Sequence, residues 1–262
     1  MEFTSAHAPH FEGKVPHLLC AAEDIADIVL LPGDPGRVEL FAQIFDDFAI
    51  VSRNREYTVG TGTYKGVKMS VCSTGIGAPS TEIAVIELIE LGAKALVRVG
   101  GTGVIQPHIP CGDLIINTAA MRKGGASQFY APPEYPAVAS FEVVESLLKI
   151  CKQEGRHVEK GICASVGSFF AGQGRSAAGR DFHDNGLIEN YRRLGVLNLE
   201  MEAETIFTLG SLFHIYTGSI CAVHCNRIKD QWLLDFQQAQ IEVGRIAMEA
   251  MAVLKKQYLT NN

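Results

Sequence analysis

The chain has 262 residues, of which 47% are hydrophobic, and a formal net charge of −6 at pH 7. A chain of this length can bury a substantial core as one large domain. The net negative charge and the lack of a basic run argue against nucleic acid or an anionic membrane as the main partner, whereas a small anionic ligand needs only a local group of arginines.

The seven cysteines are mostly embedded in apolar runs, which predicts reduced, buried thiols rather than a disulfide framework. Cys221, His224 and Cys225 are residue types that bind metals, but no second cluster completes such a site. Residues 1–16 lack the apolar core of a signal peptide, and no apolar stretch is long enough to span a bilayer. We therefore expect a cytoplasmic protein in which residues 1–16 form a flexible extension.

Short β-rich runs alternate with helical patterns along the rest of the chain. Helices are predicted over residues 80–92, 140–155, 200–215 and 235–257, and surface loops over 120–136 and 172–190. Strands are predicted over residues 25–31, 93–101, 112–119, 160–167 and 216–223, with a hairpin over 57–74 around Lys65-Gly66. This alternation predicts a single-domain α/β fold of three layers, α/β/α, with a largely parallel or mixed sheet in the middle.

The segment "IVLLPGDPGRVELF", residues 28–41, contains the first candidate site. A strand that ends in glycines and leads into a helix N-terminus offers free backbone N–H groups and a positive helix end, which together suit an anion. Gly33 belongs to this turn, and Arg37 adds a full positive charge. The segment matches neither a Walker loop nor a dinucleotide-binding fingerprint, so a tight strand-to-helix turn is the alternative interpretation.

Arg98 lies in the apolar strand pattern "ALVRVGGTG". A charge in such a run is costly unless it is paired, so either a buried carboxylate or a ligand anion is expected to meet it. The glycines that follow allow close backbone approach, and Thr102 supplies a hydroxyl. Gly33, Arg37, Arg98 and Thr102 together predict a phosphate pocket better than any one of them does.

Two further segments carry side chains suited to a sugar and a base. In "NLEMEAETI" the carboxylates of Glu200 and Glu202 flank Met201; if this start is extended, they point to opposite sides and only one faces a ligand. Such a carboxylate can accept two hydrogen bonds from a ribose diol, and a solvated helix N-terminus is the alternative. In "SFFAGQGR" aromatic side chains precede an amide and a guanidinium, which suits a planar heterocycle with C=O and N–H groups.

The chain resembles the nucleoside phosphorylase-I family over nearly its whole length, from about His17 to Leu254. The resemblance rests on segments that occur in order: "PGDPGR", "SRNREYT", "CSTGIGAPSTEIAVIEL", "LVRVGGTGVIQPHI", "GDLIINTAAMRKGGAS", "SFFAGQGR", "LNLEMEAETI" and "CNR". Within the family the likeness is greatest to uridine phosphorylases. It implies a mixed, distorted central sheet and a homohexamer built from homodimers that share active sites.

The resemblance also implies reversible phosphorolysis of uridine to uracil and ribose 1-phosphate. Inorganic phosphate is the co-substrate, and no metal or organic cofactor is required for the chemistry. Two residues are implied to reach the site from the partner subunit, His17 at the ribose 5′-hydroxyl and Arg55 at the phosphate. A structural potassium ion at the dimer interface is implied by Glu56, Ile76 and Ser80.

The remaining site residues implied by the resemblance fall into three subsites. The phosphate subsite comprises Gly33, Arg37, Arg55, Arg98 and Thr102. The ribose subsite comprises His17, Met201 and Glu202, with Glu200 beside them. The base subsite comprises Phe169, Gln173, Arg175 and Arg227. The residues implied to act in catalysis are Arg98, Gln173, Arg175 and Glu202.

The choice of base and three departures from the family pattern leave alternatives open. The purine branch typically supplies an acid from a Ser-Asp pair where this chain has Asn226-Arg227, which favours uridine over inosine or adenosine. The phosphate loop "GGTG" resembles the family's "GTTG" or "GTSG" but lacks a hydroxyl at Gly101. His224 and Cys225 replace aliphatic residues, and the polar excursion after Arg175 is slightly shorter than in the family pattern. The alternatives are a purine nucleoside phosphorylase with another acid, a nucleosidase that uses water, or a nucleoside-binding protein without turnover.

Overall fold

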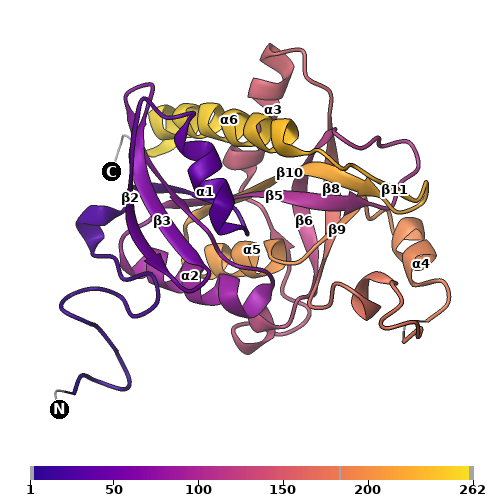
Figure 1. Cartoon of the computed structure of the whole chain (residues 1–262), viewed down its shortest axis with the longest axis horizontal. Coiled ribbons are helices and arrows are strands. Elements are labelled where there is room, and N and C mark those ends of the chain that lie inside the picture. Colours follow the sequence, from indigo (N-terminus) through magenta and orange to yellow (C-terminus); the bar gives the residue numbers. More distant parts are fainter. Residues whose placement is uncertain (1–2, 183, 260–262) are drawn as a thin grey trace.

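The computed structural model describes residues 3–182 and 184–259, and its centre is one mixed sheet (Figure 1). In space the strands follow the order β11-β10-β6-β8-β9-β5-β1-β4-β3-β2, with β7 beside β6. The strands are β1 (Ile28–Leu31), β2 (Asp47–Asn54), β3 (Tyr57–Tyr64), β4 (Val67–Cys72), β5 (Ala95–Val104), β6 (Leu114–Lys123), β7 (Ala137–Val138), β8 (Val158–Val166), β9 (Asn198–Glu200), β10 (Tyr216–Asn226) and β11 (Gln231–Trp232).

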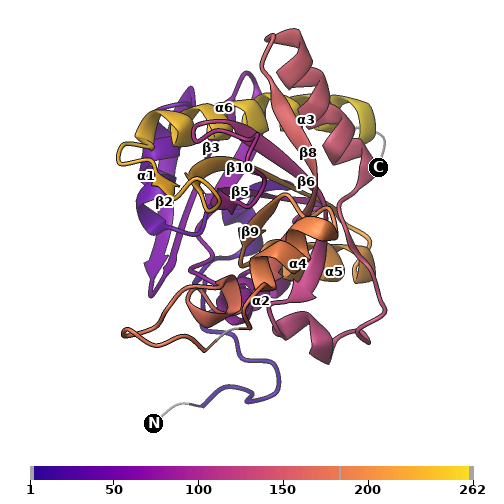
Figure 2. The same cartoon turned by 90° about the vertical axis from the view of Figure 1, so that its right-hand side faces the viewer.

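Helices cover both faces of this sheet, as the predicted α/β/α layering requires (Figures 1 and 2). Helices α1, α3 and α6 pack on one face, and α2 and α5 pack together on the other. The helices are α1 (Pro35–Ala42), α2 (Ala78–Glu90), α3 (Phe141–Gln153), α4 (Leu187–Arg193), α5 (Ala203–Leu212) and α6 (Gln237–Leu254). The predicted single-domain, three-layer fold is confirmed.

The sheet is mixed and closes on itself at one end. Strand β10 pairs in parallel with β5 and antiparallel with β6, and β6, β8, β9 and β5 complete a ring of paired strands. Such closure requires strong bending, so the predicted distortion of the sheet is confirmed. Because β1, β5 and β10 are parallel neighbours, their carboxyl ends meet at one edge of the sheet, where ligands bind in open α/β folds.

Local sequence signals account for several elements. The hairpin between β3 and β4 turns at Lys65 and Gly66, whose φ angles of 48° and 77° suit a two-residue hairpin turn. Helix α1 begins with Pro35 at its first position, and the side chain of Asp34 accepts a hydrogen bond of 2.9 Å from the backbone N of Gly36. The cap therefore fixes the helix start directly behind β1.

Other element boundaries differ from the predicted ones. Strand β2 has no predicted counterpart, because it lies at the sheet edge with alternating exposed and half-buried residues and has no strong apolar pattern. Strand β6 continues to Lys123, into the predicted loop 120–136, and α4 begins inside the predicted loop 172–190 and ends beyond it, at Arg193. Helix α5 begins at Ala203 rather than at residue 200, because residues 198–200 form β9.

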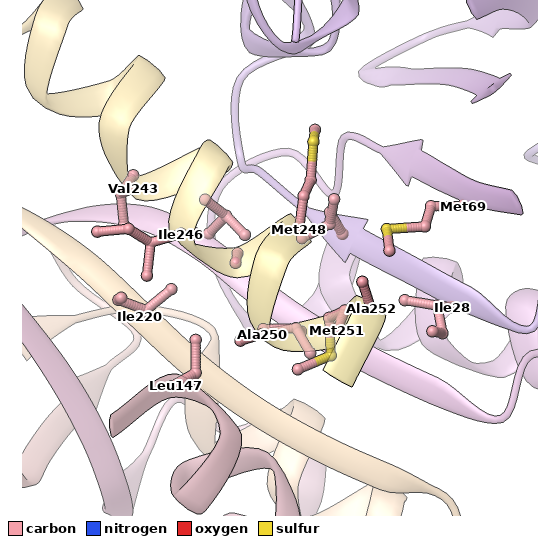
Figure 3. Close-up of a cluster of buried hydrophobic side chains, with 14 of the residues drawn as sticks. Ile28, Met69, Leu147, Ile220, Val243, Ile246, Met248, Ala250, Met251 and Ala252 are labelled. Carbon is pink, nitrogen blue, oxygen red and sulfur yellow. The ribbon is translucent and has the colours of Figure 1, made fainter. Parts of the chain in front are cut away.

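The main hydrophobic core lies between α6 and the sheet (Figure 3). Val243, Ile246 and Met251 of α6 are at most 1% exposed and pack over the sheet with Ile28 and Ile220. Full burial of each such side chain contributes about 1.5–3 kcal/mol. Within residues 3–182 and 184–259, no helix has the length and apolar character needed to cross a membrane.

Candidate active site

A pocket with a volume of about 330 Å³ opens at the carboxyl ends of β1, β5 and β10. It brings together predicted residues from segments far apart in the chain. The predicted residues that line it are Gly33, Arg37, Ile76, Arg98, Thr102, Phe169, Gln173, Arg175, Met201 and Glu202. The pocket therefore joins most of the residues expected at phosphate, ribose and base in one cavity.

The start of α1 forms a cationic wall of the pocket. Gly33 leaves little space, because a Cβ there would lie 3.1 Å from the backbone oxygen of Gly75. Arg37 is half-buried, and burial together with the nearby charge of Arg98 lowers the pKa of its guanidinium. With its amide oxygen directed at Arg37, Gln240 accepts hydrogen bonds from Nε of Arg37 at 3.1 Å and from Nη2 of Arg37 at 3.3 Å. The positive charge is thus held in place beside the helix N-terminus.

Arg98 forms the second cationic group, and two buried carboxylates meet it. Its Nε lies 2.8 Å from Oε2 of Glu200, and its Nη2 lies 2.6 Å from Oε2 of Glu202. A Cβ on Gly100 would lie 2.9 Å from the Arg98 guanidinium, so a glycine at position 100 is needed for the Arg98 side chain to lie along β5. Because a guanidinium has five N–H donors, these two contacts leave others for a ligand.

Glu200 and Glu202 both line the pocket and both carboxylates reach Arg98, although the Glu200 side chain is fully buried and that of Glu202 is 5% exposed. That only one of the two carboxylates faces the ligand stays a prediction. The extended segment ends at Glu200, and Glu202 has φ −132° and ψ −27°, so the alternation of side chains is broken before it is reached. Glu200 accepts hydrogen bonds of 2.9 Å from the backbone N atoms of Glu202 and Ala203. Glu202 accepts from the backbone N of Gly77 at 2.7 Å, and burial raises its pKa despite the opposing charge of Arg98.

A third wall is aromatic and rich in donors. The guanidinium of Arg175 stacks 3.9 Å above the ring centre of Phe169, and its Nη1 donates to Oε1 of Gln173 at 2.7 Å. Arg227 lies behind this wall and donates from Nη1 to the backbone oxygen of Gln173 at 2.7 Å and from Nη2 to that of Gly174 at 3.2 Å. Arg227 therefore holds the backbone of the loop that carries the amide and the guanidinium.

The chain matches the model of the phosphorylase superfamily over residues 27–259, which is most of its length and includes every wall of the pocket. The chain belongs to the phosphorylase superfamily. Its similarity to individual members is also extensive. It is 42% identical to a uridine phosphorylase of Thermococcus kodakarensis over 97% of this chain and 91% of the relative. It is 40% identical to a uridine phosphorylase of Escherichia coli over 84% of this chain and 89% of the relative.

A relative that is named for a purine nucleoside shows that the superfamily match alone does not determine which base is used. The chain is 33% identical to a guanosine phosphorylase of Halorubrum lacusprofundi over 82% of this chain and 85% of the relative. Both kinds of relative cover more than four fifths of the chain, so the distinction depends on particular side chains in the pocket.

Several predicted residues lie outside the pocket of their own chain. His17 does not line this pocket, and its Nδ1 lies 2.6 Å from Oε1 of Glu87. Arg55 occupies the turn between β2 and β3, is exposed and has a φ of 53°. Their roles in a neighbouring subunit's site stay predictions.

Thr102 lines the pocket, but its hydroxyl is engaged within the protein. Oγ1 donates to the backbone oxygen of Leu199 at 2.7 Å and accepts from Nδ2 of Asn198 at 2.9 Å. A hydroxyl has one donor hydrogen, so the hydrogen bond to Leu199 leaves no hydrogen to donate to a phosphate oxygen. The predicted phosphate contact of Thr102 stays a prediction, and the structure assigns the hydroxyl a bond between β5 and β9.

The pocket also contains residues that the sequence did not indicate as a group. Asp34 and Trp232 line it, as do Gly101, His224 and Cys225, which depart from the family pattern. Trp232 belongs to β11, a two-residue strand whose position depends on pairing with the end of β10. No motif reveals that pairing. The one sequence signal for Trp232 is that this aromatic residue follows Arg227 of the predicted base subsite closely.

Proposed function

We propose that the protein catalyses the reversible phosphorolysis of uridine to uracil and ribose 1-phosphate. The observation that carries the proposal is the convergence of three kinds of group in one pocket: the guanidinium groups of Arg37 and Arg98, the carboxylate of Glu202, and the paired amide and guanidinium of Gln173 and Arg175. Phosphate, ribose and a pyrimidine base need these three kinds of partner. Relatives named uridine phosphorylase at about 40% identity support the same reaction.

The reaction needs no covalent intermediate on the protein. An oxygen of bound phosphate forms the new bond to the anomeric carbon as the glycosidic bond breaks, and the electron pair of that bond passes to the base. Positive charge on the sugar is stabilised by the phosphate, and negative charge on uracil is stabilised by Gln173 and Arg175. Glu202 accepts hydrogen bonds from the ribose hydroxyls beside Met201, and its contact with Arg98 links the sugar and phosphate subsites.

Uridine is favoured over purine nucleosides by the groups at the end of β10. A departing purine is helped by an acid near its N7, whereas Asn226 uses its side-chain oxygen to accept from the backbone N atoms of Ile228 and Lys229. The guanidinium of Arg227 donates to the loop backbone, so neither residue of this pair offers the carboxyl group that the purine branch uses. A departing uracil spreads its charge over carbonyl oxygens, which suits amide and guanidinium donors.

We further propose that active sites are shared between subunits of a homodimer, and that dimers assemble into a homohexamer. Support comes from Arg55 and His17, which lie outside this chain's own pocket. The oxygen donors of Glu56, Ser80 and the Ile76 backbone suit a potassium ion at that interface: Glu56 Cγ and Ser80 Oγ lie 2.8 and 2.9 Å from the position of a Cβ on Gly75. All seven cysteines are free thiols, which supports a reducing, cytoplasmic location.

The test is product analysis of the purified protein with uridine, thymidine, inosine, guanosine and adenosine, each with and without phosphate. Uracil that appears only with phosphate is the expected result. Release of a purine base instead would contradict the assignment of the base, and release of base without phosphate would indicate a nucleosidase. Heat of binding on mixing with uridine, without any free base, would indicate a nucleoside-binding protein.

A further inference from the structure

The imidazole of His224 occupies the space that a side chain on residue 101 would fill. Residues 101 and 224 lie on the neighbouring parallel strands β5 and β10. A Cβ built on Gly101 would lie 2.1 Å from Cε1 and 2.4 Å from Nδ1 of His224. Those distances exclude any other residue than glycine at position 101 while the imidazole is in place. Two departures from the family pattern are therefore one coupled change.

The coupled change exchanges one polar group for another at the same place. The family resemblance implies a hydroxyl at the position of Gly101 and an aliphatic residue at the position of His224. Here the hydroxyl is absent and an imidazole edge stands over the glycine, within the pocket that Arg37 and Arg98 line. The polar group is thus supplied from β10 rather than from β5.

The ring is held in a defined position and charge state. It stacks on Phe236, with ring centres 4.2 Å apart and an interplanar angle of 23°. Its Nε2 lies 3.5 Å from the side-chain amide of Gln240, the same residue that faces Arg37. Burial, and secondly the charge of Arg37, lower the pKa of His224 to about 4, so the ring is neutral near pH 7.

We propose that His224 is a phosphate-contacting residue that replaces the missing hydroxyl of residue 101, and that Gln240 positions it. The Gln240 oxygen that accepts from Arg37 also faces Nε2, so Nε2 carries the proton of the neutral ring and Nδ1, the nitrogen nearer Gly101, is the acceptor. Hydrogen phosphate has one P–OH donor, which can donate to Nδ1. The inference rests on the phosphate subsite of the proposed function.

The experiment compares His224→Ile, His224→Gln, Gly101→Thr and the double variant Gly101→Thr/His224→Ile with the parent. Phosphate affinity is measured by calorimetry without nucleoside, and the phosphate KM and kcat are measured with uridine. His224→Ile is expected to weaken phosphate binding about tenfold, because one hydrogen bond to an anion is lost. His224→Gln keeps donor and acceptor and is expected to stay within about threefold of the parent.

The double variant provides the decisive comparison. Gly101→Thr alone forces its side chain into the imidazole, whereas Gly101→Thr/His224→Ile restores the arrangement of the family and is expected to recover phosphate affinity to within about threefold of the parent. If Gly101→Thr does not fold, the double variant and the two His224 variants still decide the question. Unchanged affinity in His224→Ile, or a double variant no better than His224→Ile, would overturn the inference.

Failure of the proposed function gives a different pattern. A parent that binds phosphate and shows these variant effects, but releases no uracil, contradicts uridine phosphorolysis and supports the role of His224. A parent that does not bind phosphate contradicts both.

Discussion

Arg98 and Glu202 form an ion pair inside the pocket, with Nη2 of the arginine 2.6 Å from Oε2 of the glutamate and both side chains 5% exposed. The arginine belongs to the predicted phosphate subsite and the glutamate to the predicted ribose subsite. Their contact fixes the two subsites relative to each other before any ligand binds, and such preorganisation lowers the cost of ordering side chains on binding. Glu200 completes the arrangement from the other side of the guanidinium.

Replacement of Arg98 should therefore affect both stability and phosphate binding. Arg98→Ala leaves two buried carboxylates unpaired, which is expected to lower the free energy of unfolding by about 3–5 kcal/mol and to raise the phosphate KM strongly. Arg98→Lys keeps the charge but loses the planar fork, so it should fold better and still bind phosphate weakly. Urea denaturation and steady-state kinetics measure the two effects. An unchanged phosphate KM in both variants would remove Arg98 from the site.

Gln173 should matter for turnover more than for folding. Its side-chain oxygen orients Arg175, and its amide N–H groups remain for the base. Gln173→Ala is expected to lower kcat/KM for uridine roughly 10- to 100-fold, since contacts to developing charge are lost. It is expected to lower the free energy of unfolding by only about 1 kcal/mol. Gln173→Glu keeps the acceptor for Arg175 and places a negative charge where uracil becomes an anion, so it should be stable and inactive. Full activity in Gln173→Glu would show that the residue acts only by orienting Arg175.

Shared active sites can be tested by complementation between inactive variants. Arg37 lines the pocket of its own chain and Arg55 does not, so Arg37→Ala and Arg55→Ala should damage each site from different subunits. When the two variants are unfolded together and refolded, half of the dimers are mixed and one of their two sites is intact, which is expected to restore about a quarter of the parent activity. A mixture no more active than its components would contradict a shared site. The Arg53→Ala variant, at an exposed pair with Glu39, is a suitable surface control.

The sequence predicted the layers and most pocket residues because their signals are local. Apolar periodicity, the capped turn after β1 and the glycines after Arg98 are all readable in short windows. What could not be predicted depends on pairing between distant segments. The pairing of β10 with β5 places His224 over Gly101, and the end of β9 turns Glu202 toward Arg98. Such contacts follow from tertiary closure, which no local pattern specifies.

His224 should also make the stability of the protein dependent on pH. Burial lowers its pKa from 6.5 to about 4, so between these values the unfolded chain binds a proton that the folded protein does not. The resulting loss in the free energy of unfolding is absent above pH 6.5 and grows as the pH falls through that window. It is on the order of 1 kcal/mol at pH 5 after allowance for solvent access to the ring. His224→Asn removes the titration, so it should lose less stability than the parent between pH 7.5 and pH 5. Urea denaturation at fixed protein concentration measures this difference, and parallel pH profiles for the two proteins would contradict a neutral imidazole at residue 224 of the folded protein.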